Sequence, residues 1–404
     1  MNSFELYKRH EISYLKKEFK INIIDNINLN EYIDFKRNVF IDKLINRKIP
    51  ITNRNSTKTL NIFNNTKFLY GYSYERYDSY INYPNFCSEF YKVKVTQKYK
   101  SKVFFTNSGM SAITSLLLSI NNILDKFSFI FPDKDIYFET YDFYNKYINK
   151  YNDCNTEIIY IDTISKKFDI EKYKMIIDKN NYIFAVIIDT TCFVPEELNK
   201  IIKYVMKKNK LCILVRSHTK LDMMGSEISG LGSILYLIPN NLNDNYFNEI
   251  KKIMSESYYL LGKFGALCLP DKFPEFIFFD KFKIINTERI KRIEENNYLL
   301  YLFLKENLNK GKIILPNHKK FILYAIDNGL FSEEQYNIIE KKIKDFVMNE
   351  EDIFYACSFG FDYIALDAYY DINEKNYVMR ISMNDNLDIN NQYLKIKEFI
   401  NDNF

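Results

Sequence analysis

The sequence has no tryptophan and, in 404 residues, only three histidines, ten glycines and eight prolines. The three histidines (His10, His218 and His318) are widely separated, so we expect no histidine-rich metal centre. Neither the Walker A pattern nor G-x-G-x-x-G occurs, so the usual signatures of nucleotide-binding sites are missing. The common nucleotide-binding classes are therefore not expected.

Paired cysteines, membrane segments and strong charge are also missing. The six cysteines lie far apart without a C-x-x-C pair, which predicts reduced thiols and neither a disulfide framework nor a zinc site. The first residues contain no apolar signal-peptide core, and no run approaches about 18 apolar residues, so we expect a cytoplasmic protein without membrane contact. A net charge of +4 without a basic stripe argues against nucleic acid as a partner.

The chain does contain enough apolar material for a large core, with 47% hydrophobic and 27% charged residues. From about residue 100, short runs rich in Ile, Val and Phe alternate with segments of helical periodicity. The expected strands are 102–108, 127–131, 157–162, 182–189 and 211–215, and the clearest helices are 109–124, 171–179 and 196–208. This alternation predicts an α/β fold with a mostly parallel central sheet and helices on both faces.

Two regions flank this core. Residues 1–95 favour helices followed by a polar, tyrosine-rich loop or arm over 66–85. Toward the C-terminus, a long helical pattern leads into mixed strand and helix patterns. We therefore predict an N-terminal helical segment with an arm (1–95), a large α/β domain (96–255) and a smaller α+β C-terminal domain (256–404).

Ligands of open α/β sheets bind beyond the carboxyl ends of the strands, and three predicted strand ends carry unusual residues. The first is Asn107-Ser108-Gly109-Met110-Ser111, where a strand turns into a helix. Backbone N–H groups at a helix N-terminus suit a phosphate, and Gly109 permits close approach. Alternatively, Ser108 only caps the helix.

The second strand end is Asp189-Thr190-Thr191. A carboxylate that closes an apolar strand is costly to bury unless it is paired. Asp189 either caps the following helix or partners a protonated ring nitrogen.

The third strand end is Ser217-His218-Thr219-Lys220, after the run LCILV. Strand alternation places the hydroxyls of Ser217 and Thr219 on one side and His218, which we expect to be structural, on the other. A lysine near apolar walls can form a Schiff base, although a surface lysine in a polar turn fits the same pattern. A phosphate cradle, an acidic partner and a lysine, in this order, are what pyridoxal 5'-phosphate (PLP) requires.

Together with further motifs, these residues resemble the cystathionine γ-synthase and methionine γ-lyase family of fold-type I PLP-dependent enzymes. Tyr74-Glu75-Arg76 resembles its Tyr-x-Arg, which implies that Tyr74 and Arg76 reach the cofactor phosphate of a neighbouring subunit. The segment from Ser108 to Ala112 resembles its SGMxA phosphate loop, which implies that Ser108, Gly109 and Met110 contact the cofactor. Tyr137 stands where the family's YGGT tyrosine stacks on the pyridine ring.

The resemblance extends through the second and third strand ends. Asp189-Thr190-Thr191, followed by Pro195, resembles D-N-T-F-x-x-P, which implies that Asp189 and Thr191 contact the cofactor. Ser217-His218-Thr219-Lys220 resembles S-A-T-K, which implies that Lys220 is the Schiff-base lysine.

Two C-terminal motifs complete the resemblance. Ser358-Phe359-Gly360 resembles S-L-G, and Arg380-Ile381-Ser382 resembles R-x-S. They imply that Ser358 and Arg380 bind the substrate, with the arginine holding its carboxylate. Without the resemblance, a surface charge at a strand end is the preferred interpretation of Arg380.

The sequence also departs from the family. Both glycines of YGGT are lost, and K-Y-x-x-G-H has become residues 220–227. There is one fewer βα unit between Tyr137 and Lys220. Either the strand ending in Asp189 serves two family positions, or LCILV merges two strands, which would put Arg216 nearer the ring. The interval from Asp189 to Lys220 leaves room for one helix, which favours Asp189.

The resemblance implies a homodimer or homotetramer with shared active sites and an amino-acid substrate. It implies a lyase or synthase that eliminates or replaces a γ- or β-substituent, in sulfur-related metabolism, with Lys220 as base and Tyr137 as acid. Two alternatives remain open: an aminotransferase on the same fold, and a catalytically inactive homologue.

Overall fold

The computed structural model describes residues 8–21, 27–46, 59–62, 68–72, 80–149, 156–180, 182–308, 310–326, 332–371, 376–386 and 389–404. The chain forms two compact units. Unit 1 contains residues 1–43, 220–228 and 279–404, and unit 2 contains residues 44–219 and 229–278. Each unit is assembled from separate segments, whereas the domains predicted from the sequence are contiguous.

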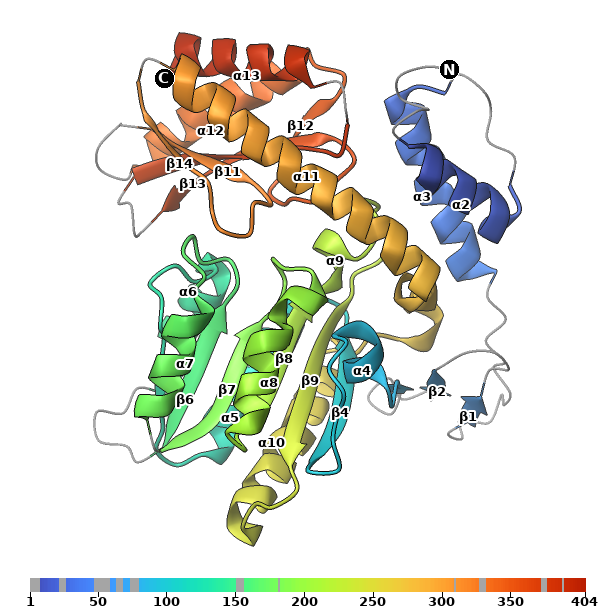
Figure 1. Ribbon diagram of the computed structural model, residues 1–404, viewed down its shortest axis with the longest axis vertical. Helices are drawn as coiled ribbons and strands as arrows, with labels where there is room; N and C mark the ends of the chain where they lie inside the picture. Colours follow the sequence, from blue (N-terminus) through green and yellow to red (C-terminus); the bar gives the residue numbers. More distant parts are fainter. Residues whose placement is uncertain are drawn as a thin grey trace. The chain divides into compact units, whose positions relative to one another are not determined.

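Unit 2 is built around a six-stranded sheet in the order β4-β9-β8-β7-β6-β5 (Figure 1). The strands are β4 (Tyr99–Thr106), β5 (Ser128–Ile130), β6 (Glu157–Asp162), β7 (Ile183–Asp189), β8 (Leu211–Ser217) and β9 (Gly232–Pro239). Strands β5 to β8 run parallel, and β9 runs antiparallel to both β8 and β4. The predicted mostly parallel sheet is confirmed. Strand β9 is missing from the sequence prediction because a continuous apolar run fits a buried helix equally well.

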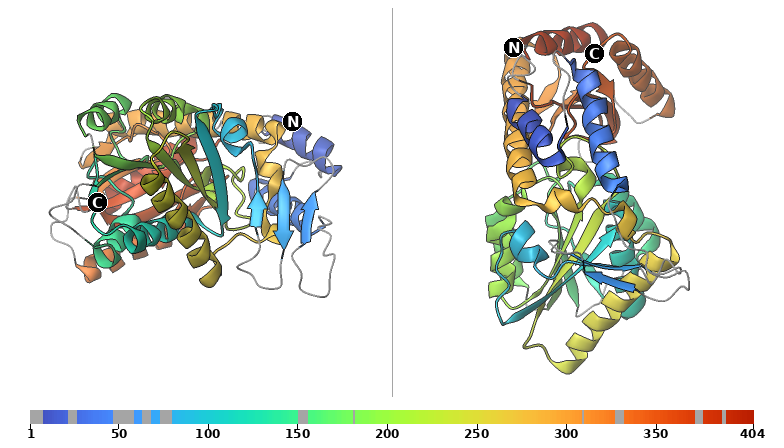
Figure 2. Two further views of the ribbon diagram at one scale, coloured as in Figure 1. Left: turned by 90° about the horizontal axis from the view of Figure 1, so that it is seen from below. Right: turned by 90° about the vertical axis from the view of Figure 1, so that its right-hand side faces the viewer.

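Helices cover both faces of this sheet. Helices α5 (Gly109–Ile123) and α10 (Asp244–Lys263) pack together on one face, and α7 (Ile170–Lys179) and α8 (Asn199–Lys207) lie on the other (Figures 1 and 2). The apolar positions of α5 recur at helical spacing and are buried against the sheet core. Each such buried leucine or isoleucine contributes about 1.5–3 kcal/mol.

Unit 2 also contains a small antiparallel sheet of β1 (Thr59–Ile62), β2 (Leu69–Tyr72) and β3 (Tyr80–Asn82). The predicted loop over 66–85 is therefore wrong for residues 69–72 and 80–82, which form strands. Tyrosines pack well in strands, and their β-propensity outweighs the polarity on which the prediction relied. Two further helices of this unit are relevant to the site, α4 (Phe86–Phe90) and α6 (Phe138–Tyr147).

Unit 1 contains a five-stranded sheet in the order β10-β11-β14-β13-β12. Its strands are β10 (Lys312–Ile314), β11 (Ile322–Ile326), β12 (Ile353–Tyr355), β13 (Ile364–Asp371) and β14 (Asn376–Ser382). Its helices are α2 (Arg9–Phe19), α3 (Leu29–Ile45), α11 (Asp280–Asn307), α12 (Glu333–Val347) and α13 (Asn390–Asn403). The predicted α+β character of the C-terminal region is confirmed. Among the described residues, no helix is both long and apolar enough to cross a membrane.

Candidate active site

The first and third predicted strand ends meet in unit 2. Ser108 caps α5, because its Oγ accepts a hydrogen bond from the Ser111 N–H at 3.0 Å. A Cβ added to Gly109 would lie 2.6 Å from the Cβ of Ser217, so only glycine allows this approach. The Oγ of Ser217 lies 3.0 Å from the Oγ1 of Thr219. The N-terminus of α5 and three hydroxyl groups are thus gathered in a donor set that suits a phosphate.

The third strand end differs in shape from its prediction. Strand β8 ends at Ser217, and residues His218–Leu221 form a helical turn, α9, instead of continuing the strand. Ser217 and Thr219 nevertheless share one side, as their 3.0 Å separation shows. His218 is fully buried with its Nε2 2.8 Å from the Oγ of Ser233, which agrees with the structural role predicted for it.

Hydrogen bonds connect the second strand end to the third. Asp189, 5% exposed at the end of β7, accepts hydrogen bonds from the N–H and the Oγ1 of Thr191 at 2.9 and 2.6 Å. The Oγ1 of Thr191 in turn accepts from the N–H of Ser217 at 3.0 Å. One α-helix, α8, lies between β7 and β8, as the interval between Asp189 and Lys220 predicts.

Arg216 points elsewhere. Its buried guanidinium donates hydrogen bonds to the carbonyl groups of Thr190 and Phe193 and lies 5.4 Å from the ring of Phe90. Adjacent strand residues face opposite sides, so Arg216 is directed away from Ser217. Its hydrogen bonds to Thr190 and Phe193 connect the loop after β7 to strand β8.

Tyr137 and Met110 lie at the start of helices near this edge of the sheet. The N–H of Tyr137 donates to the Oδ2 of Asp162 at 2.9 Å, and Asp162 pairs with Asp189 in the register of β6 and β7. The Oγ1 of Thr140 lies 3.9 Å from the Sδ of Met110, which brings the first turns of α5 and α6 together.

In unit 1, Lys220 and Arg380 belong to one group of contacts. The Nζ of Lys220 lies 5.2 Å from the ring centroid of Phe359, whose ring packs against Phe321 at 5.4 Å. The guanidinium of Arg380 lies 5.5 Å from the same Phe321 ring. Asp367 accepts from the Nε and Nη2 of Arg380 at 2.9 and 2.7 Å. Burial raises the pKa of Asp367, while the charges of Arg380 and Lys220 oppose this rise.

The segment that follows Lys220 is held by backbone contacts. Gly360 has a φ of +87°, and a Cβ there would overlap the carbonyl oxygen of Lys220. The Nδ2 of Asn286 donates to the carbonyl of Leu221 at 2.6 Å. The Nζ of Lys36 donates to the carbonyl of Met224 at 2.6 Å. Lys220 therefore stands at the start of a fixed segment, with Ser358 two residues before Gly360.

A buried ion cluster supports this segment. It consists of six charged side chains that are at most 1% exposed: Lys8, Glu11, Lys36, Arg289, Asp362 and Asp385. Burial opposes the charge of Asp362, but Lys36, Lys8 and Arg289 hold the pKa of that carboxyl far below its usual range. The Nη2 of Arg289 also donates to the carbonyl of Gly360 at 2.9 Å.

Two predicted site residues lie outside the part of the chain that the structure describes. The structure also contains two buried carboxylates that the sequence did not lead us to predict. Tyr74 and Arg76 lie outside the described residues. Asp367 was missed, although a carboxylate in the middle of the apolar strand IALDAYYD signals a buried partner. Asp162, at the end of a similar strand, carries the same signal.

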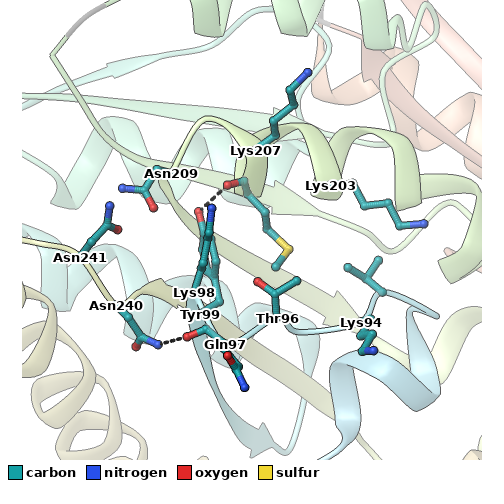
Figure 3. A pocket seen from close by; sticks show the side chains of 12 residues that line it. Lys94, Thr96, Gln97, Lys98, Tyr99, Lys203, Lys207, Asn209, Asn240 and Asn241 are labelled. Atoms are coloured by element: carbon teal, nitrogen blue, oxygen red, sulfur yellow. Dashed lines mark hydrogen bonds between the residues drawn. The ribbon is translucent and has the colours of Figure 1, made fainter.

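Unit 2 also contains a pocket of about 690 Å³ (Figure 3). It is formed where β4 and β8 begin, at the opposite ends of the strands from Asp189 and Ser217. Lys98 stands beside Tyr99, with Lys94 and Lys203 to one side (Figure 3). None of the predicted site residues that the structure describes lines it.

No family model matches this sequence, and no curated protein matches it. Solved structures do match. Cystathionine gamma-lyase from yeast is 17% identical, with a TM-score of 0.53 over 94% of this chain and 99% of that one. A putative O-acetylhomoserine (thiol)-lyase from Campylobacter jejuni, solved with a pyridoxyl-lysine monophosphate, is 15% identical, with a TM-score of 0.50 over 74% and 81%. Alanine aminotransferase from Pyrococcus furiosus is 13% identical, with a TM-score of 0.50 over 79% and 80%. The chain therefore shares the fold-type I architecture of these proteins.

Proposed function

We propose that this protein is a PLP-dependent enzyme that acts on an amino acid through Lys220. The observation that carries the proposal is the meeting of the α5 N-terminus with Ser217 and Thr219, directly before Lys220 in the chain. This donor set fits the phosphate of PLP, and the shared fold supports the same assignment. Ser108, Gly109 and Met110 would hold the phosphate side of the cofactor.

Asp189 is the residue that we assign to the pyridine nitrogen. Its carboxylate is buried and hydrogen-bonded through Thr191 to Ser217, so it belongs to the same group as the phosphate donors. Arg216, the alternative, faces carbonyl groups on the other side of β8. Tyr137 would stack on the ring from the start of α6, and Tyr74 and Arg76 would reach the phosphate of a second subunit.

PLP supplies an aldehyde and a ring that stabilises negative charge at the substrate α-carbon. Lys220 would hold that aldehyde and, once released, accept the α-proton at its Nζ. Arg380 and Ser358 would bind the substrate carboxylate. Tyr137 would donate a proton to the leaving group.

For the reaction, we propose elimination or replacement at the γ- or β-carbon of an amino acid, in sulfur-related metabolism. The motifs that resemble the cystathionine γ-synthase and methionine γ-lyase family support this choice over other reactions of the same fold. Retention of Lys220 together with Arg380 counts against an inactive homologue, since a protein without catalysis has no need of both.

The test is the visible absorption spectrum of the purified protein with PLP, beside a Lys220→Ala variant and a Lys210→Ala control. We expect a yellow band that borohydride bleaches in the wild type and the control, and no such band in Lys220→Ala. Protein that stays colourless with added PLP would contradict the proposal.

Product analysis then separates the reactions. Release of ammonia and a 2-oxo acid from γ-substituted amino acids would support the lyase. Turnover that depends on an added 2-oxo acid would instead indicate the aminotransferase and contradict the proposed reaction, while leaving Lys220 and the cofactor in place.

A further inference from the structure

Asp367 and Arg380 form a fixed pair within unit 1. They face each other directly across the antiparallel strands β13 and β14. The carboxylate takes the side-on edge of the guanidinium, with Oδ1 2.9 Å from Nε and Oδ2 2.7 Å from Nη2. The side chain of Asp367 is 5% exposed and that of Arg380 is 8% exposed, so water scarcely screens the pair.

Aromatic rings complete the support of Arg380. Its guanidinium carbon lies 5.5 Å from the ring centroid of Phe321 and 5.8 Å from that of Tyr369. Guanidinium groups are attracted to aromatic faces at such distances. The bidentate pair and the two rings together restrict the rotation of the arginine head group.

A guanidinium has a second bidentate edge, formed by Nη1 and Nη2, on the side away from a carboxylate bound at Nε and Nη2. An unsupported arginine would lose side-chain entropy when it orders around a substrate, at the expense of affinity. An arginine that the protein already holds presents its edge without this loss.

We propose that Asp367 is a positioning residue, which fixes Arg380 so that its Nη1–Nη2 edge receives the carboxylate of an α-amino acid substrate. The proposal rests on the function proposed above and deepens it, because it names the carboxylate as the group that Asp367 serves. Asp367 does not touch the substrate; it acts through Arg380.

The experiment uses the PLP-loaded full-length protein and two probes: L-methionine and the amine that lacks its carboxylate. Binding is followed as the change in the visible band. For Asp367→Asn, which keeps the shape of the side chain but removes its charge, we expect the Kd of L-methionine to rise about tenfold. The Kd of the amine should stay within about twofold.

Two further variants make the result specific. Asp371→Asn is the matched control, because Asp371 is also a buried carboxylate of β13 but pairs in register with Asn376. It should leave both Kd values unchanged. Arg380→Lys should weaken L-methionine alone, and adding Asp367→Asn to it should cost little more, because Asp367 acts through the arginine.

The outcomes are distinct. A selective loss for L-methionine in Asp367→Asn supports the proposal. Unchanged or tighter binding of L-methionine, or an equal loss for both probes, overturns it while leaving the proposed function intact. If no variant and no wild-type protein gives the visible band, the proposed function fails and this proposal fails with it.

Discussion

At Gly360, one loop of unit 1 touches the backbone of another so closely that no side chain fits between them. Its φ is +87°, and a Cβ would overlap the carbonyl oxygen of Lys220. Gly265 offers a contrast, because it also has a positive φ, of +64°, but a Cβ there would meet nothing within 4 Å. A comparison of substitutions at Gly360 and Gly265 therefore distinguishes the effect of backbone strain from the effect of displacing Lys220.

We predict that Gly265→Ala costs about 1 kcal/mol of stability and leaves the visible band unchanged. Gly360→Ala should cost more than that and should also weaken the band, because Lys220 must move. Urea unfolding gives the first quantity and absorbance at saturating PLP the second. An undisturbed band in a folded Gly360→Ala protein would show that Lys220 does not depend on this contact.

Single residues also show what the sequence could predict. Lys220, Ser217 and Thr219 could be proposed as site residues because they lie within four consecutive residues that resemble a known motif. Asp367 was not, because its significance depends on Arg380 lying opposite it, and that register is a property of the folded sheet. A carboxylate within an apolar strand is the sequence signal from which Asp367 could have been predicted as a buried, paired residue.

Among the elements, helices α2 and α3 contribute to the buried ion cluster, and their sequences do not predict this contribution. Lys8, just before α2, contacts Asp362 and Asp385 at 2.8 Å, and Lys36 of α3 contacts Asp362. These partners are more than 300 residues away in the chain for both lysines. Amphipathic periodicity predicts that such helices exist but cannot identify charged partners so remote in sequence.

We predict that Asp362→Asn destabilises the protein by about 3–5 kcal/mol, because it leaves Lys8, Lys36 and Arg289 buried with too little negative charge. Asp142→Asn is the control: its pair with Lys146 is exposed and should contribute at most about 0.5 kcal/mol. Urea unfolding of both variants measures the difference. Equal, small effects would contradict the importance of the cluster.

The cluster also predicts a dependence on pH. The pKa values of Asp362 and Asp385 are lowered on folding, so their contribution is present above their ordinary value of 3.8 and is lost as the pH falls below it. The free energy of unfolding should therefore fall as the pH is lowered from about 5 to about 2, and by less in Asp362→Asn.

At the scale of the whole molecule, the sequence predicts the architecture of the central sheet better than it predicts which segments of the chain form each unit. Strand and helix alternation was enough to predict the mostly parallel sheet. It did not predict β9, which reverses direction, or the assembly of unit 1 from three stretches of chain. Periodicity describes neighbours along the chain, whereas both of these features depend on contacts between distant segments.

The proposed sharing of sites between subunits gives a prediction for the assembly. If Arg76 serves the cofactor of a neighbour, a dimer of one Lys220→Ala and one Arg76→Ala subunit contains one intact site. Mixing the two inactive variants after reversible dissociation should restore about a quarter of wild-type activity. No recovery, or an active monomer in equilibrium sedimentation, would contradict shared sites.

The proposed function requires Lys220 to hold the aldehyde of PLP. The most direct measurement is borohydride reduction of the PLP-loaded protein, followed by mass-spectrometric mapping of its peptides. We expect a phosphopyridoxyl group on Lys220 and on no other lysine. A label distributed over surface lysines such as Lys98 and Lys203, or no label at all, would contradict it.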